Sequence, residues 1–183
     1  MTTPVDFDRI AHEEMPQAVR IAEFFEAHAP KPYFVLDIGC GPGIYVDAIN
    51  VKGSAWGIDN DDRIPKRPEF IKMDVTGPVA APVQGNIVLS LEVGEHIPEE
   101  NAREYIGFIR ATGADVVYFS AAAPGQGGEG HINCQPKSYW AEKFCHAGFY
   151  YDHGETVRWL QFMSQGYHMG WLIQNGQVFR RAR

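Results

Sequence analysis

The sequence lacks the features expected of a secreted or membrane-spanning protein. Its three cysteines, Cys40, Cys134 and Cys145, are an odd number with no C-x-x-C spacing. They therefore predict free thiols, because a disulfide framework needs pairs and a zinc site needs closely spaced ligands. No apolar run approaches membrane-spanning length, and the first residues have neither the basic nor the apolar region of a signal peptide. We therefore expect a cytoplasmic protein with no membrane association.

Basic residues are also scarce. The 183-residue chain has 16 Lys and Arg against 23 Asp and Glu, a net charge of −7, and its basic cluster is confined to Arg180, Arg181 and Arg183. Nucleic-acid-binding proteins usually present a basic face to phosphate, so the charge argues against a nucleic-acid partner. The hydrophobic content of 45% suffices for a sizeable core in one domain spanning residues 1–183.

Glycine is concentrated between a short apolar run and an expected helix. Residues 35–46 read VLDIGCGPGIYV, with Gly39, Gly41 and Gly43 at every second position after Asp37. A strand followed by a glycine turn and a helix start brings backbone N–H groups close to a ligand. The spacing differs from the G-x-G-x-x-G of dinucleotide-binding loops, and the Lys of a Walker loop is missing. A carboxylate at Asp37 suits a cationic ligand and would repel the pyrophosphate of NAD.

This loop resembles motif I of the class I S-adenosylmethionine-dependent methyltransferases, and the resemblance extends from Val35 to Arg181. It implies that S-adenosyl-L-methionine is the cofactor and S-adenosyl-L-homocysteine the product. It also implies that the carboxylate of Asp37 faces the cationic methionine end. The cofactor-binding residues expected from the whole resemblance are Asp37, Gly39, Cys40, Gly41, Gly43, Asp59, Asn60, Asp74, Val75, Leu91, Glu92 and Val93.

Two further acidic positions belong to this expected cofactor site. Asp59, followed by Asn60, ends an expected strand over residues 54–58, where a carboxylate can accept both ribose hydroxyls in a doubly wound fold. An Asp after a strand is also a common turn residue. The resemblance places Asp74 near the adenine amino group and Val75 beside the ring.

The segment after the fourth expected strand, residues 90–98, reads SLEVGEHIP. It resembles the corresponding motif in the small-molecule branch of the family, which implies that Glu95 and His96 face the substrate. Glu92 has an alternative role as a turn residue or as the partner of another side chain. His96 has an ordinary pKa suited to a general base near neutral pH, and its alternative role is a helix cap or a packing histidine.

A second unusual stretch, residues 121–134, reads AAAPGQGGEGHINC. So many glycines between a strand and a helix predict a long loop at the ligand-binding edge of the sheet. We interpret it as a mobile substrate lid in which His131 is a substrate ligand or base and Asn133 contacts substrate. The alternative is a flexible connection in which His131 caps the next helix. Asp115 and Asn133 are available as ligands, but no spacing singles them out, and no metal is predicted.

Strands that alternate with helices predict an α/β, doubly wound, Rossmann-like sheet. We expect seven strands, mostly parallel, with an antiparallel last strand at residues 177–181 and helices on both faces. The N-terminal segment, residues 1–30, should contain a helix from near Pro16 to before Pro30. We expect it to pack on the sheet, and the alternative is that it closes over the cofactor. Residues 78–84 predict a short or missing helix. Residues 170–180 predict either a hairpin that turns at Asn175 and Gly176 or, as the resemblance favours, a helix that ends there and is followed by the last strand.

The resulting functional hypothesis is direct methyl transfer to a small molecule such as a sugar or another metabolite. The predicted partner is this acceptor alone, and the protein is expected to be a monomer or a homodimer. Two alternatives remain: a cofactor-binding protein without activity, such as a regulatory subunit, and an NAD-dependent oxidoreductase. GHIN and the following QPKSYW resemble a subgroup of small-molecule and sugar-modifying methyltransferases but do not define one acceptor.

Overall fold

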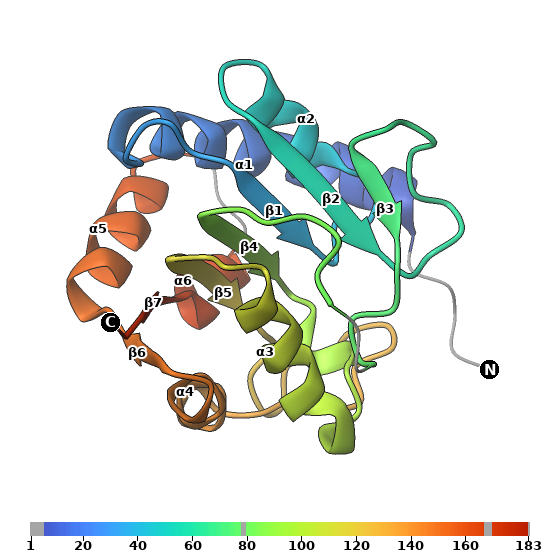
Figure 1. Cartoon of the computed structure of the whole chain (residues 1–183), viewed down its shortest axis with the longest axis vertical. Helices are drawn as coiled ribbons and strands as arrows, with labels where there is room; N and C mark the ends of the chain where they lie inside the picture. Colours follow the sequence, from blue (N-terminus) through green and yellow to red (C-terminus); the bar gives the residue numbers. More distant parts are fainter. Residues whose placement is uncertain (1–5, 78–79, 167–169, 183) are drawn as a thin grey trace.

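A single mixed sheet carries helices on both faces (Figure 1). The computed structural model describes residues 6–77, 80–166 and 170–182. The strands are β1 (Val35–Ile38), β2 (Ala55–Asp59), β3 (Phe70–Lys72), β4 (Ile87–Leu91), β5 (Val116–Ser120), β6 (Phe149–Tyr151) and β7 (Gln177–Arg181). Their order is β3-β2-β1-β4-β5-β7-β6, in which β1 to β5 are parallel and β7 is antiparallel to both β5 and β6. The predicted doubly wound, Rossmann-like sheet with an antiparallel last strand is confirmed.

The helices divide between the two faces of the sheet. They are α1 (Phe7–His28), α2 (Ile44–Asn50), the short 3-10 helices η1 (Gly94–His96) and η2 (Glu99–Asn101), α3 (Ala102–Ala111), α4 (Lys137–His146), α5 (His153–Ser164) and α6 (Gly170–Asn175). Figure 1 shows α1 and α2 together above β1 and β2, with α3 and α4 on the opposite side. The helix α6 confirms the helix rather than the hairpin.

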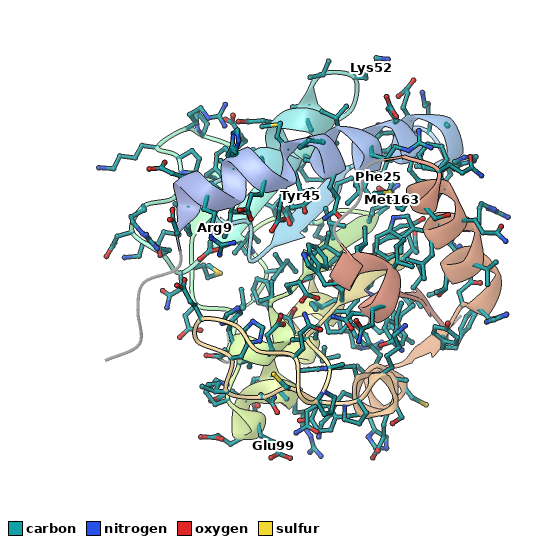
Figure 2. All side chains as sticks on the ribbon, turned by 180° about the vertical axis from the view of Figure 1, so that it is seen from behind. Arg9, Phe25, Tyr45, Lys52, Glu99 and Met163 are labelled. Carbon is teal, nitrogen blue, oxygen red and sulfur yellow. The ribbon has the colours of Figure 1, made fainter. Side chains whose placement is uncertain are left out.

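Apolar side chains that point alternately to the two faces of the central strands give two hydrophobic cores. Ile87 and Leu89 of β4 pack against the α1 side, whereas Val88 between them packs against the α3 side. Successive strand residues point to opposite faces, so a strand covered on both faces must be apolar throughout. On the first side Phe25 and Met163 lie together between α1 and α5 (Figure 2). These cores fix the carboxyl ends of the parallel strands relative to one another.

Helix α1 begins earlier than the predicted start near Pro16. The carboxylate of Asp6 accepts a hydrogen bond from the backbone N–H of Arg9 at 3.0 Å and caps the helix at Phe7. Pro16 lies inside the helix, where it cannot donate to the carbonyl of His12. Both residues are exposed, so water can satisfy that carbonyl. The predicted helix start at this proline was therefore wrong.

The connection between β3 and β4 has no helix in its described parts, residues 73–77 and 80–86, as predicted. The remainder of the predicted linker, residues 78–79, lies outside the described residues. Among the helices of the described ranges, none is both long and apolar enough to cross a membrane.

Candidate functional site

A cavity of about 690 Å³ opens at the carboxyl ends of the parallel strands. Its walls come from the segments that follow β1, β2, β3, β4 and β5, together with the first turns of α1. Ligands of open α/β sheets bind at this edge, and the volume suits a cofactor. Of the predicted site residues it is lined by Asp37, Gly39, Cys40, Gly41, Asp59, Asn60, Asp74, Val75, Leu91, Glu92, Val93, His96 and His131.

The glycine loop turns sharply from β1 into α2. Gly39 has φ +79°, and an added Cβ would lie 2.3 Å from Cγ2 of Val93. Gly43, with φ +84°, is the N-cap of α2, where a Cβ would lie 2.4 Å from the ring of Phe70. Both positions therefore need glycine for the turn and for close packing. Gly43 does not line the cavity. It forms the turn that leads from the loop into α2.

Asp37 is the buried carboxylate of the site. It is 2% exposed, and its Oδ2 has no hydrogen-bond partner among the described residues. Burial, together with the nearby charges of Asp59 and Glu14, raises its pKa well above the ordinary value. Because an unpaired buried carboxylate is costly, a cationic group in the cavity would stabilise it.

Asp59 braces the glycine loop. Its Oδ2 accepts from the backbone N–H of Gly41 at 2.8 Å, and its Oδ1 accepts from that of Asp61 at 2.9 Å. Its carboxylate therefore links the end of β2 to the turn after β1. The remaining lone pairs can accept ribose hydroxyls, and that role stays a prediction, as does a cofactor contact by the neighbouring Asn60.

The segment after β3 supplies Asp74 and Val75. Oδ1 of Asp74 accepts from the hydroxyl of Thr76 at 2.6 Å and from its backbone N–H at 2.8 Å, which lowers the pKa of Asp74. Val75 is buried beside the cavity. The Cys40 thiol packs where a Cβ on Gly57 would be, and burial raises its pKa. Because that thiol stays protonated near neutral pH, it is no nucleophile.

The first turns of α1 form a wall of the cavity, built from residues that were not singled out in the sequence. Phe7, Arg9, Ile10 and Glu14 all line the cavity, and Figure 2 shows Arg9 at the start of α1. The hydroxyl of Tyr45 donates to Glu14 at 2.7 Å, and burial raises the pKa of that carboxyl. The predicted packing of the N-terminal helix is correct, but the helix also covers the cavity. The Asp6 cap was the available signal for this earlier start.

Glu92 holds the loop after β5 against the end of β4. Its φ of +52° is left-handed, an uncommon conformation for a residue with a side chain. Gln126 donates to its Oε2 at 3.0 Å and Asn175 to its Oε1 at 3.3 Å, while Asn175 also donates to Oε1 of Gln126 at 2.9 Å. Glu92 thus lines the cavity and is also a partner of other side chains, the alternative left open above.

The predicted acceptor side brings Glu95, His96 and His131 together. The imidazole rings of His96 and His131 are 5.0 Å apart, edge to face, and Nε2 of His131 lies 3.8 Å from Oε1 of Glu95. Burial lowers the pKa of His96. Burial, with the charge of Glu92, raises that of Glu95 to about 8. The two histidines line the cavity, whereas Glu95 lies behind them, 0% exposed.

Asn133 is not among the residues that line the cavity, and its substrate contact stays a prediction. It is 4% exposed, and its Oδ1 accepts from the side chain of Gln135 at 3.0 Å. Its backbone N–H donates to the carbonyl of Glu95 at 2.9 Å. Asn133 therefore joins the loop to η1. Gln126 and Trp171, which were not predicted, do line the cavity.

Comparison with known proteins supports a fold but no sequence family. The sequence matches no protein-family model and no curated protein. The structure resembles the SAM-bound aminopentose methyltransferase CalS10 of Micromonospora echinaspora (14% identity, 100% of this chain, 99% of that chain, TM-score 0.69). It also resembles DesVI of Streptomyces venezuelae (13%, 98% and 100%, 0.69). A third match is the SAH-bound magnesium protoporphyrin IX methyltransferase of Synechocystis PCC 6803 (16%, 100% and 90%, 0.64).

These likenesses cover essentially the whole chain and are consistent across proteins with different acceptors. The chain has the fold of the class I S-adenosylmethionine-dependent methyltransferases. At 13–16% identity the resemblance extends to architecture alone.

Proposed function

We propose that the protein is a methyltransferase that binds S-adenosyl-L-methionine in the cavity at the carboxyl ends of β1, β2 and β4. The observation that carries this proposal is the unpaired, buried Oδ2 of Asp37 on the wall of the cavity, beside the glycine loop. The ligand needs a cationic group for that oxygen. The methionine end of S-adenosyl-L-methionine carries both an ammonium and a sulfonium.

The charge of the cavity favours this cofactor over a dinucleotide. Carboxylates line it from several segments of the chain: Glu14, Asp37, Asp59, Asp61, Asp74, Glu92 and Glu129. Negative walls would repel a pyrophosphate, which weakens the oxidoreductase alternative. Asp59, at the end of β2, is the proposed ribose partner, and Asp74 and Val75 the proposed adenine contacts.

When bound, S-adenosyl-L-methionine supplies a methyl group for in-line transfer. The chain contributes orientation through the glycine loop and the wall of α1, and a local environment partly shielded from water. The acceptor would enter beside His96 and His131, where either imidazole can contact it or take a proton from an alcohol. The loop of residues 121–134 would be the lid over this side.

The acceptor is proposed to be a small molecule. The structural neighbours include an aminopentose methyltransferase and a porphyrin methyltransferase. Carboxylates outnumber Arg9 on the cavity wall, which disfavours a nucleic-acid acceptor. A monomer or homodimer acting in the cytoplasm fits this proposal, as do the free Cys40, Cys134 and Cys145. The alternative of a cofactor-binding protein without turnover shares the same cofactor site.

The decisive experiment measures melting temperature with S-adenosyl-L-methionine, S-adenosyl-L-homocysteine and NAD, each in large excess. A ligand at about a hundred times its Kd adds about 2.7 kcal/mol to the stability of the folded state. The two sulfur cofactors should stabilise the protein and NAD should not. In Asp37→Asn the shift should shrink, while the melting temperature of the free protein stays the same or rises, because a buried charge has been removed.

Stabilisation by NAD alone, or by none of the three ligands, would overturn the proposed cofactor site. Transfer of radiolabelled methyl groups to a panel of sugars, phenols and amines then separates an enzyme from a non-catalytic binder. A protein that binds the cofactor and transfers methyl to none of these acceptors supports the second alternative.

A further inference from the structure

Three metal-ligating side chains converge where the acceptor would enter. Glu95, His96 and His131 each offer one ligand atom, and these atoms lie within 4.8 Å of one another. They come from η1 and from the loop after β5, which are joined by backbone hydrogen bonds. The N–H groups of Ile132 and Asn133 both donate to the carbonyl of Glu95 at 2.9 Å. These hydrogen bonds fix the position of η1 relative to the loop after β5.

Both histidines are oriented by backbone carbonyls. Nδ1 of His96 lies 3.1 Å from the carbonyl oxygen of Gly130, and Nδ1 of His131 lies 3.3 Å from that of Gln126. A carbonyl can only accept, so each Nδ1 carries the proton and each Nε2 keeps its lone pair. The Cys134 sulfur, 3.7 Å from Nδ1 of His131, donates to the same carbonyl of Gln126 at 3.5 Å. This arrangement is the usual outer shell of metal-bound histidines.

Glu95 supplies a buried carboxylate oxygen. Its side chain is fully buried, and neither carboxylate oxygen has a partner at full hydrogen-bond geometry in the described part of the chain, although the nearby backbone N–H groups of Glu95 and Ala122 act to lower the pKa of this carboxyl. Its Oε1 faces a basic atom, Nε2 of His131, at 3.8 Å. A second acidic side chain, Glu92, lies close enough to repel it. One buried carboxylate, that of Glu95, and one partly buried carboxylate, that of Glu92, lie beside two imidazole lone pairs and favour a cation between them.

We propose that Glu95, His96 and His131 bind a divalent transition-metal ion at the acceptor end of the cavity. Two imidazole nitrogens and one carboxylate oxygen are a ligand set of zinc, iron, cobalt and manganese, and three protein ligands leave coordination positions open. His96 and His131 line the cavity. The open positions therefore face the space where the acceptor enters.

The role of the ion rests on the function proposed above. A hydroxyl of the acceptor would occupy an open position, where the ion lowers its pKa so that the proton is released to water. The oxygen then forms a bond to the methyl carbon while the carbon–sulfur bond breaks and its electron pair returns to sulfur. The ion would thus replace a histidine as the means of activating the oxygen. The two imidazoles would be ligands rather than bases.

The test titrates the full chain, freed of any histidine tag and of metal, with Co²⁺ and Zn²⁺. Visible absorption of bound Co²⁺ reports on the coordination, and calorimetry gives stoichiometry and Kd for both ions. We expect one ion per chain and a rise in melting temperature. Glu95→Gln, His96→Gln and His131→Gln should each weaken binding by more than about a hundredfold. The exposed Glu99→Gln and His146→Gln are matched controls and should bind as the unaltered chain does.

Absence of binding by the unaltered chain, or unchanged affinity in all three ligand variants, would overturn the metal site. Because Glu95 is buried, its variant is first checked for cooperative unfolding without metal, and the two cavity-lining histidine variants test the site independently. Cofactor-induced stabilisation of the metal-free chain is measured in parallel. Stabilisation without metal binding overturns the metal site alone, whereas metal binding without cofactor stabilisation overturns the proposed function alone.

Discussion

The two ends of the cavity are constructed differently. At the glycine loop, the geometry comes from backbone conformation over consecutive residues, 37–43, and from Asp59, whose carboxylate accepts two backbone N–H groups. At the opposite end, side chains of Glu92, Gln126 and Asn175 hold together segments from β4, the loop after β5 and α6. One end depends on φ angles and the absence of Cβ atoms. The other depends on hydrogen bonds between side chains distant in sequence.

This difference predicts how each end responds to substitution. A strained glycine position tolerates almost no side chain, because both the turn and the packing against it oppose one. A hydrogen-bonded network loses stability in smaller steps, and other side chains can replace its members. Changes at the loop should therefore remove cofactor binding, whereas changes in the network should alter acceptor use while cofactor binding persists.

The largest effect is expected for Gly39→Ala. Its φ of +79° disfavours a side chain, and the new Cβ would lie 2.3 Å from Val93. The combined cost should be about 2–5 kcal/mol of unfolding free energy, with loss of cofactor binding. Urea denaturation and the cofactor-induced shift in melting temperature measure both effects.

The matched control for that change is Gly107→Ala in α3. An added Cβ there would meet no atom of the described residues within 4 Å. Because alanine is the better helix former, this variant should gain about 0.5–1 kcal/mol. Equal stability losses in the two variants would contradict the idea that the glycine loop is set by close packing.

A smaller and more selective effect is expected for Asn175→Ala. Asn175 is 2% exposed and donates to both Gln126 and Glu92. Its loss removes this donor from two partly buried acceptors, at a cost of about 1–3 kcal/mol. Amide exchange in residues 121–134 should become faster and methyl transfer slower, while cofactor affinity is retained.

The control for this change is Asn101→Ala, since that side chain caps no helix. A loss of cofactor affinity as large as that of activity would contradict the separation of the two ends.

The covering helix should contribute less than either end. Phe7 of α1 lines the cavity, and its ring lies 3.8 Å from where a Cβ on Gly41 would be. Phe7→Ala should therefore weaken cofactor binding by about 1–1.5 kcal/mol through lost apolar contact. Val19→Ala, at a site 46% exposed on the same helix, should leave affinity unchanged. Calorimetric titration with S-adenosyl-L-homocysteine distinguishes these outcomes, and equal affinity in both variants would remove α1 from the cofactor site.

The same difference accounts for how much of the molecule could be predicted from its sequence. The glycine end was predictable because its parts are contiguous, and because glycine at alternate positions after an acidic strand residue is typical of a ligand-binding turn. The sheet followed from apolar runs such as β4. Gly43 was correctly placed at the start of α2. Its missing Cβ makes room for Phe70, and its contact with the cofactor stays a prediction.

The acceptor end was only partly predictable. Glu95, His96 and His131 were each singled out, yet their proximity depends on how the loop after β5 folds back, and sequence spacing carries no trace of this. For the same reason no metal site was predicted. Asn133 was singled out as part of the proposed lid, and the hydrogen bond by which its backbone N–H joins the loop to η1 could not be predicted from the sequence. Gln126 gave no signal, because its partners Glu92 and Asn175 are distant in sequence.

The smallest expected effect is a change in the pH dependence of stability for Glu14→Gln. Burial raises the pKa of Glu14 from its ordinary value of 4.5, so the native state keeps this proton to higher pH than the unfolded chain does. Native protein therefore binds more protons above about pH 4.5, and Glu14 makes the free protein less stable as pH rises. Glutamine removes that contribution and can still accept from Tyr45. Urea unfolding between about pH 5 and pH 8 should show a smaller loss of stability in the variant.

The control is Glu142→Gln, exposed on α4, which should leave the pH dependence of stability unchanged. Since Glu14 faces the cavity, a cationic ligand should also flatten the dependence in the unaltered chain. Identical pH profiles for the unaltered chain and Glu14→Gln would show that this carboxyl has the same affinity for protons in the folded and unfolded states.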